Sequence, residues 1–274
     1  MNEKMEKLTE MLQKGVEEYF KSDTYKILLN TMAKFHNYSY GNCILIAQQM
    51  PTAQYVAGYQ SWKRNFHRQV KKLEKSIRII SPTTYKTKDE DGNEIERQGF
   101  KAASVFDISQ TEPIPDMEEI TIGVPELTGD IEGYTGLITA CTLISPVNIM
   151  YDSIAGGVKG YFSDSEQKIV INTGMSQKHT AHTLLHEICH AKIHNHEIMK
   201  DVKKDRHTME TEAESVSYIC SKYFGFDTSV YSFPYIASWL GKEHEQLLRS
   251  SMITIQKTAD EIIKAIEEEM RNMI

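Results

Sequence analysis

The 274-residue chain contains only four cysteines, and no two of them form a C-x-x-C pair. The scatter is unlike the cysteine spacing of zinc-ribbon or disulfide-framework proteins. We therefore expect all four thiols to be reduced, as in a cytoplasmic protein. They are Cys43, Cys141, Cys189 and Cys220.

The sequence also lacks long apolar runs and an excess of positive charge. No apolar run approaches the length of a membrane span, and Met1–Lys7 lacks the apolar core of a signal peptide. A membrane partner is therefore not expected. The formal net charge is −7, so binding of nucleic acid would require a local basic patch. The length and the 40% hydrophobic content suit one large or two ordinary globular domains.

Against this background, the stretch His186-Glu187-Ile-Cys-His190 stands out as an H-E-x-x-H motif. On a helix, residues i and i+4 share a face, so both imidazoles can bind one metal ion. Glu187 can then take a proton from the water at that metal. The pattern predicts a hydrolytic zinc site with Zn²⁺ as cofactor.

The surrounding sequence predicts that this motif lies on a helix. Ser176 is a suitable N-cap, and apolar residues recur at helical intervals behind it. The histidines of the motif project away from this apolar stripe, so they can face a cleft. The stripe consists of Ala181, Leu184, Leu185, Ile188 and Ala191.

A catalytic zinc site takes three protein ligands, and the sequence offers two candidates for the third. His196 follows at the metzincin spacing, but Ile193 stands where that pattern has a glycine. We rank it second to Glu210, which lies 20 residues after His190 on a second predicted helix within residues 208–224.

Glu214 shares a helix face with Glu210, whereas Glu212 points elsewhere. We expect Glu214 to orient a ligand imidazole from behind. His182 and His194 continue the i+4 row of the motif, and we interpret both as surface histidines.

Upstream of the motif, the sequence predicts an N-terminal part of helices and a hairpin. Helices are expected at residues 2–20, 24–36 and 39–49, with a short helix opening near Trp62. Strands are expected at residues 78–80 and 100–108, joined by a loop containing Asp91-Gly-Asn93.

The remaining chain reads as a linker followed by a second domain. Residues 111–132 are acidic and proline-containing, and no lysine or arginine occurs between Lys101 and Lys159. A helix near residues 133–143 and a small antiparallel sheet should precede the H-E-x-x-H helix, and a long helix near residues 244–270 should close the chain. The strands of this small sheet are expected at residues 147–151, 159–162 and 168–172.

A basic stretch between Ser61 and Arg78 holds seven lysines and arginines and one acid, Glu74. Aromatic residues lie just upstream, and this combination suits single-stranded nucleic acid, which needs stacking faces and cations. A packed aromatic core with a solvated basic surface is the alternative interpretation. The candidate DNA-binding residues are Tyr40, Trp62, Lys63, Arg64, Lys71, Lys72 and Lys75.

Four motifs in this order resemble ArdC-type antirestriction proteins. They are Asn37-Tyr-Ser-Tyr-Gly-Asn42, Val56-Ala-Gly-Tyr-Gln-Ser-Trp-Lys63, Val70-Lys-Lys-Leu-Glu-Lys-Ser-Ile77 and Tyr235-Ile-Ala-Ser-Trp-Leu240. The resemblance implies an N-terminal domain that binds single-stranded DNA and a C-terminal domain similar to ImmA/IrrE-like metallopeptidases. In those, a glutamate ligand follows H-E-x-x-H, and the matching position here is Glu210. The resemblance also implies a protein carried by a mobile element.

The chain departs from that family at three positions. Tyr40 stands where the family usually has tryptophan, and Leu73 and Ser76 stand where it usually has glycines. Replacing glycines changes the backbone conformations that this turn can adopt.

The sequence thus predicts a helix-rich α+β chain of two domains with small antiparallel sheets. Residues 1–110 would bind single-stranded DNA, residues 111–132 would link, and residues 133–274 would form a zincin-like metallopeptidase domain. Two alternatives stay open. One is a dedicated zinc endopeptidase that cleaves a regulatory protein, and the other is a non-catalytic DNA-binding module with structural zinc.

Overall fold

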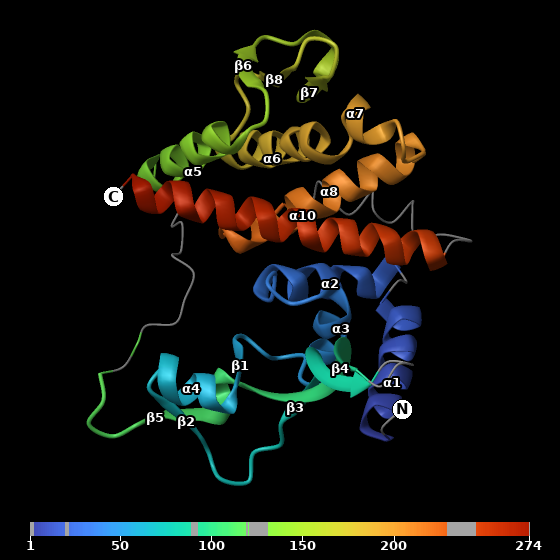
Figure 1. The fold of residues 1–274 in the computed structure, drawn as a ribbon. Coiled ribbons are helices and arrows are strands. Elements are labelled where there is room, and N and C mark those ends of the chain that lie inside the picture. The colour runs from blue at the N-terminus through green and yellow to red at the C-terminus, as the bar shows by residue number, and fades with distance from the viewer. Residues whose placement is uncertain are drawn as a thin grey trace. The chain divides into compact units, whose positions relative to one another are not determined.

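The structure is a computed structural model that describes residues 3–19, 22–88, 93–118, 120, 131–228 and 245–273. The chain packs into two compact units, each continuous in space but not in sequence (Figure 1). The N-terminal unit comprises Met1–Tyr19 and Gly41–Ile122, and the C-terminal unit comprises Phe20–Tyr40 and Gly123–Ile274. This mixture of helices and small sheets is the predicted α+β class.

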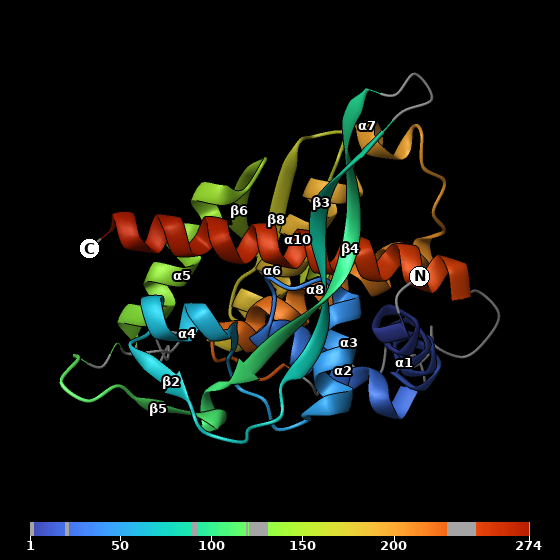
Figure 2. The ribbon, with the colours of Figure 1, turned by 60° about the horizontal axis from the view of Figure 1, so that its bottom comes forward.

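The N-terminal unit combines helices with two antiparallel sheets, ordered β1-β4-β3 and β2-β5. The hairpin of β3 and β4 forms a long twisted ribbon (Figure 2). Its elements are α1 (Glu3–Tyr19), α3 (Tyr40–Gln49), β1 (Val56–Gly58), α4 (Tyr59–Asn65), β2 (Arg68–Val70), β3 (Ile77–Lys88), β4 (Glu94–Asp107), the 3-10 helix η1 (Ile108–Gln110) and β5 (Thr111–Pro113).

Helix α3 is the centre of this unit because its apolar run Cys43–Ala47 is buried. Two amides on the same helix bond to the backbone of β3. Asn42 accepts from the Ile80 N–H and donates to the Ile80 carbonyl, both at 2.9 Å. Gln49 makes the equivalent pair with Arg78 at 2.9 and 2.8 Å. These amides satisfy backbone groups on the edge of β3 that β4 does not reach.

Both ribbon strands are longer than the predicted segments 78–80 and 100–108. The polar residues after Ile80 read as a loop, yet they pair in register with β4 as far as Lys88 opposite Glu94. Residues 91 and 92 of the predicted loop lie outside the described residues.

The C-terminal unit is built in helical layers with one three-stranded sheet. Figure 1 shows α5 and α6 between the sheet and the pair α8 and α10, with α2 on the other side of that pair. Its elements are α2 (Ser22–Lys34), α5 (Ile131–Ile144), β6 (Asn148–Asp152), the 3-10 helix η2 (Ala155–Gly157), β7 (Gly160–Ser163), β8 (Lys168–Asn172), α6 (Gln177–Ile193), α7 (His196–Met199), α8 (Arg206–Tyr223) and α10 (Glu245–Asn272).

The order of sheet, H-E-x-x-H helix and glutamate helix is the predicted one. The sheet is mixed rather than wholly antiparallel, because β8 occupies its centre. Strand β7 pairs with one edge of β8 in the antiparallel direction, and β6 pairs with the other edge of β8 in the parallel direction. The apolar strand β8 is buried through Ile169, Val170 and Ile171, and it supports α6.

The domain boundaries differ from the predicted ones in two places. Residues 20–40 belong to the C-terminal unit, where the Tyr25 hydroxyl lies 3.4 Å from Ser215 Oγ and the Tyr218 hydroxyl donates to Asn30 at 2.8 Å. The start of the predicted linker is strand β5, which pairs with β2. Residues 119 and 121–130, and the motif at residues 235–240, lie outside the described part of the chain.

Candidate metal centre

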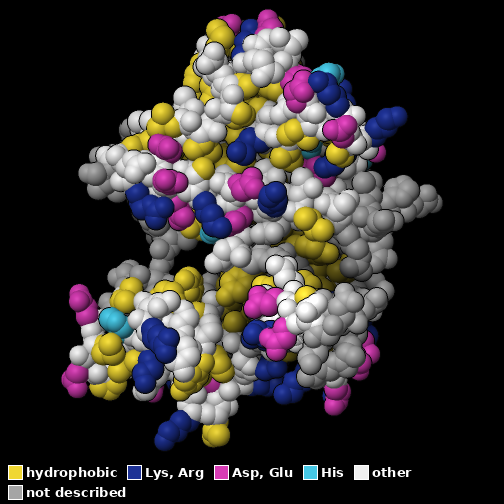
Figure 3. All heavy atoms as spheres, in the orientation of Figure 1, with side chains coloured by type: hydrophobic (Ala, Val, Ile, Leu, Met, Phe, Trp, Pro, Cys, Tyr) yellow, Lys and Arg dark blue, Asp and Glu magenta, His cyan; other side chains and the backbone are white. Residues whose placement is uncertain are grey.

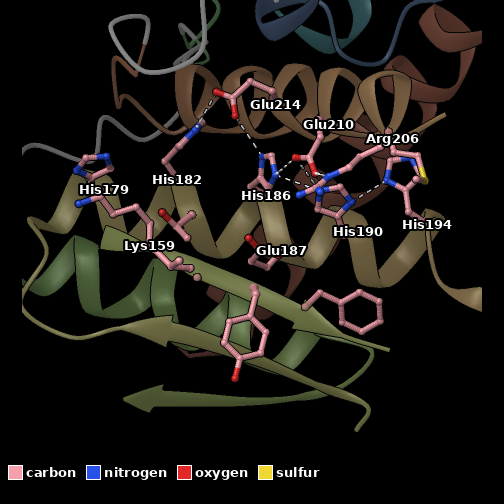
Figure 4. Close-up of a pocket in the computed structure, with 16 residues that line it drawn as sticks. Lys159, His179, His182, His186, Glu187, His190, His194, Arg206, Glu210 and Glu214 are labelled. Carbon is pink, nitrogen blue, oxygen red and sulfur yellow. Dashed lines mark hydrogen bonds and ion pairs between the residues drawn. The ribbon is translucent and has the colours of Figure 1, made fainter. Parts of the chain in front are cut away.

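Helix α6 presents the H-E-x-x-H motif as the sequence predicts. The Ser176 hydroxyl caps its N-terminus by accepting from the His179 N–H at 3.3 Å. All five residues of the apolar stripe from Ala181 to Ala191 are buried, which fixes the rotation of the helix. Its other side faces α8 and the strand β7 (Figure 4).

Three ligand atoms converge between α6 and α8. The Nε2 atoms of His186 and His190 lie 3.0 Å apart, and the Glu210 Oε2 lies 3.4 and 3.6 Å from them. Zinc–nitrogen bonds of about 2.1 Å in a tetrahedral site place ligand atoms about 3.4 Å from one another. The donor set and its spacing therefore fit a tetrahedral divalent cation, and among the described residues this trio forms the one such cluster.

Glu210 reaches the two rings from the first turns of α8. Asp205 caps this helix by accepting from the Thr208 N–H at 2.7 Å. Arg206 Nε lies 3.6 Å from the second oxygen of Glu210. Hydrogen bonds with His186 and His190 hold the pKa of Glu210 far below its usual range.

Glu214 stands one turn further along α8 and lies behind His186. Its two oxygens lie 3.2 Å from His186 Nδ1 and 3.0 Å from His182 Nε2. This is the geometry that the predicted orienting role requires. Our interpretation of His182 as a surface residue was wrong, because its side chain is 7% exposed and faces this carboxylate.

The electrostatics of the cluster favour positive charge. Burial opposes a charge on His186, but its hydrogen bonds with Glu210 and Glu214 outweigh burial and raise its pKa to about 10. A divalent cation at the same place would supply that charge between the same carboxylates. The residues present therefore fit a metal in charge as well as in spacing.

Glu187 occupies the side of α6 that faces β7 (Figure 4). Burial raises the pKa of this carboxyl, and the nearby His186 and His190 offset only part of the rise. A raised pKa brings a carboxylate closer to the range in which a general base works best. The Phe162 backbone hydrogen-bonds to Glu187 and fixes its position.

An open cleft of about 930 Å³ gives access to these residues. Strand β7 and the residues before it form one wall, and α6 and α8 form the other. Two basic residues, Lys159 and Arg206, also line the cleft. A peptide segment fits a space of this size.

The interpretation of His194 as a surface histidine was also wrong, because its side chain is 2% exposed. Its two ring nitrogens contact His190 and Glu212. The only sequence signal for this role was that His194 continues the i+4 row of the motif. That signal was not sufficient, because Glu212, the partner of His194, lies on another helix, α8. His196, the second-ranked ligand, is exposed on α7 and lies outside the described metal cluster.

The candidate DNA-binding residues fall into three groups. Trp62 is fully buried and donates from Nε1 to the Phe106 carbonyl at 2.8 Å, so its assignment as a stacking residue was wrong. Tyr40 is half-buried at the start of α3. The lysines and arginine of the set are exposed: Lys63, Arg64, Lys71, Lys72 and Lys75.

Lysine and arginine side chains gather over α4 on the face shown in Figure 3. The exposed turn after β2 carries Lys71, Lys72 and Lys75. Leu73 within it is fully exposed and has a φ of 67°, a left-handed conformation that glycine adopts more readily. The turn thus keeps the conformation of a glycine position although leucine occupies it.

Fold and site together define an α+β chain of two units, one of which carries an H-E-x-x-H helix facing a glutamate helix. Residues 1–107 match the family described as the N-terminal domain of anti-restriction factor ArdC. By this match, residues 1–107 form a domain of the ArdC N-terminal type.

The fold resembles two crystal structures of the antirestriction protein ArdC from plasmid R388. The metal-free structure aligns with a TM-score of 0.54 at 19% identity, and the Mn(II)-bound structure with 0.52 at 18%; both alignments cover 86% of each chain. At this identity the likeness concerns the fold alone.

An uncharacterized protein of Bacillus anthracis is 27% identical in an alignment 322 residues long. The alignment covers 100% of this chain and 53% of that protein. The chain therefore spans about half the length of this curated relative. No described helix is long and apolar enough to cross a membrane.

Proposed function

We propose that this chain is an ArdC-type antirestriction protein and that its C-terminal unit carries a zinc-dependent peptidase site. The convergence of two imidazole nitrogens and one carboxylate oxygen in an open cleft, beside a buried glutamate, carries this proposal. His186, His190 and Glu210 would hold the metal, and three protein ligands leave a position for substrate or water. The Mn(II)-bound ArdC structure supports a divalent cation in this fold.

A divalent cation held there would polarise the scissile carbonyl and acidify an attacking water. Glu187 would take the proton from that water and later deliver it to the leaving amine. Its burial supports this role, since a weakly solvated carboxylate accepts a proton more readily. The strand β7 lies at the edge of its sheet, so an extended peptide could pair with it across the cleft.

The test is Glu187→Gln, which keeps the size of the side chain and removes the base. We expect cleavage of fluorogenic peptide libraries to fall by about 100-fold or more, with zinc content unchanged. Glu197→Gln, an exposed glutamate of α7, is the matched control and should cleave like the wild type. Equal activity in both variants would refute Glu187 as the base.

We also propose that the N-terminal unit binds single-stranded DNA. The family match over residues 1–107 and the exposed basic turn of Lys71, Lys72 and Lys75 support this. Phosphate contacts make binding salt-dependent, so fluorescence anisotropy with a labelled oligonucleotide should show affinity falling steeply with salt. Replacing the three lysines with alanine should weaken binding and flatten the salt slope.

The matched control replaces three exposed lysines of the C-terminal unit, Lys200, Lys203 and Lys257. This triple variant changes the net charge equally and should bind the oligonucleotide like the wild type. Equal loss in both triple variants would mean that net charge alone attracts the oligonucleotide. Absence of binding at low salt would refute the DNA proposal.

A further inference from the structure

His194 lies buried between a candidate metal ligand and a carboxylate. Its Nδ1 is 3.0 Å from Nδ1 of His190, and its Nε2 is 2.9 Å from the Glu212 Oε2. His190 uses its other nitrogen, Nε2, in the metal cluster. Figure 4 shows the part of this row from the cluster through His190 to His194. The row continues from His194 to Glu212.

Glu212 is fully buried, and three side chains hold it in place. Lys204 Nζ lies 2.8 and 2.7 Å from its two oxygens, and the Ser251 hydroxyl donates at 2.7 Å. A carboxylate bonded to an ammonium group accepts hydrogen bonds and has no hydrogen to donate. The Nε2 of His194 must therefore be the donor to Glu212.

The short contact between the two Nδ1 atoms needs one donor and one acceptor. If His190 binds metal through Nε2, that nitrogen offers its lone pair and the proton of the ring sits on Nδ1. His190 Nδ1–H must then donate to His194 Nδ1, which agrees with the proton of His194 on Nε2. The two ends of the row impose the same proton arrangement.

We propose that Glu212, acting through His194, is a positioning pair that fixes His190 in the tautomer that binds metal. This inference rests on the proposed metal site and deepens it. Glu214 holds the other ring directly, since its Oε2 lies 3.2 Å from His186 Nδ1. The two ligand histidines thus differ: a carboxylate orients one, and an imidazole backed by a carboxylate orients the other. Such partners typically contribute about 10- to 100-fold to metal affinity.

The first test compares His194→Phe with His194→Asn in the full chain. Phenylalanine fills the ring's space without an acceptor, whereas the asparagine Oδ1 can take the place of Nδ1. We expect zinc affinity, measured by competition with a chromophoric chelator, to fall about 10- to 100-fold for H194F. H194N should lose less than tenfold, and H196F, on an exposed residue, should match the wild type.

Melting of the metal-free variants separates positioning from folding. A residue that only fills the core would lower the melting temperature while leaving the zinc affinity of the folded protein unchanged, and that result would overturn the proposal. Equal affinity losses in H194F and H194N would also overturn it, because the acceptor would then be irrelevant.

The second test reads the tautomers directly by long-range ¹⁵N–¹H NMR of zinc-loaded wild-type protein. We expect the proton of His190 on Nδ1 and that of His194 on Nε2. A bare Nε2 on His194 would overturn the proposal. Wild-type protein that binds no zinc would refute the metal site itself, whereas normal zinc binding with the wrong tautomer refutes only the positioning pair.

Discussion

Gly160 sets how closely the wall of the cleft approaches the metal helix. A Cβ added there would lie 2.8 Å from Thr183 Cγ2, 3.0 Å from the Val170 carbonyl and 3.1 Å from Ile171 Cδ1. Thr183 belongs to α6, and the other two belong to β8. Only glycine therefore lets β7 begin so near the helix that carries the site.

Gly160→Ala should accordingly destabilise the C-terminal unit by about 1–3 kcal/mol, because the extra methyl group overfills a packed contact. Urea unfolding followed by circular dichroism measures this. Thr183→Ser removes the nearest atom, so the double variant should recover part of the loss. If the loss of unfolding free energy in the double variant equals the sum of the losses in the two single variants, the strain lies elsewhere.

Residue roles were predictable where one helix fixes the spacing. The i+4 rule placed His186 and His190 together and paired Glu210 with Glu214, and the structure brings all four side chains to one site. Contacts that depend on a partner from elsewhere were not predictable. Trp62 looked like a stacking residue because nothing in its local sequence shows the Phe106 carbonyl that it bonds.

At the scale of elements, Asp107 joins three pieces of the N-terminal unit. It ends β4, caps η1 and fixes the residues before β1. Its Oδ1 accepts from the backbone N–H groups of Gln54 and Tyr55 at 2.7 and 3.0 Å. Its Oδ2 accepts from the N–H and the hydroxyl of Ser109 at 3.0 and 2.7 Å.

Asp107→Asn should cost the N-terminal unit about 1–3 kcal/mol, because an amide N–H₂ would face backbone donors that need an acceptor. Fluorescence of Trp62 in a Trp239→Phe background reports the unfolding of this unit. Glu96→Gln, an exposed carboxylate on β4, is the control and should change stability little. Equal destabilisation by both variants would contradict the role of Asp107.

The same carboxylate predicts a pH dependence. Burial would raise the pKa of Asp107, but its hydrogen bonds from Ser109, Gln54 and Tyr55 lower it below the usual value of 3.8. A depressed native pKa stabilises the fold above the unfolded value, and this contribution disappears as pH falls through the native value. Acid titration of Trp62 fluorescence should show the wild type losing its advantage over Asp107→Asn below about pH 4.

Elements with strong periodicity were predictable, and their pairing partners were not. Strand β8 was predicted at residues 168–172, where it occurs, because its apolar run is short and bounded. The polar outer half of the β3–β4 ribbon gave no such signal, since neither face of it is buried against a core. Cross-strand pairing alone extends it to Lys88 and Glu94.

At the scale of the molecule, α2 belongs with the C-terminal unit although it follows α1 directly. His36, just after α2, lies 2.8 Å from Asp260, and Gln256 donates to its carbonyl at 2.8 Å. An amphipathic pattern shows that a helix buries one face but not which partner covers it. The boundary near residue 20 was therefore not readable from the sequence.

The division into two compact units predicts two unfolding events, and zinc should raise the midpoint temperature of only one of them. A ligand that binds the native state alone stabilises it by RT ln(1 + [L]/Kd), about 2.7 kcal/mol at a hundredfold excess over Kd. Calorimetry with and without zinc should show that zinc raises the midpoint temperature at which the C-terminal unit unfolds. The transition reported by Trp62 in the Trp239→Phe background should stay in place. Glu210→Ala should abolish the shift and Glu197→Ala should retain it, whereas a zinc effect on the Trp62 transition would mean that the two units unfold together.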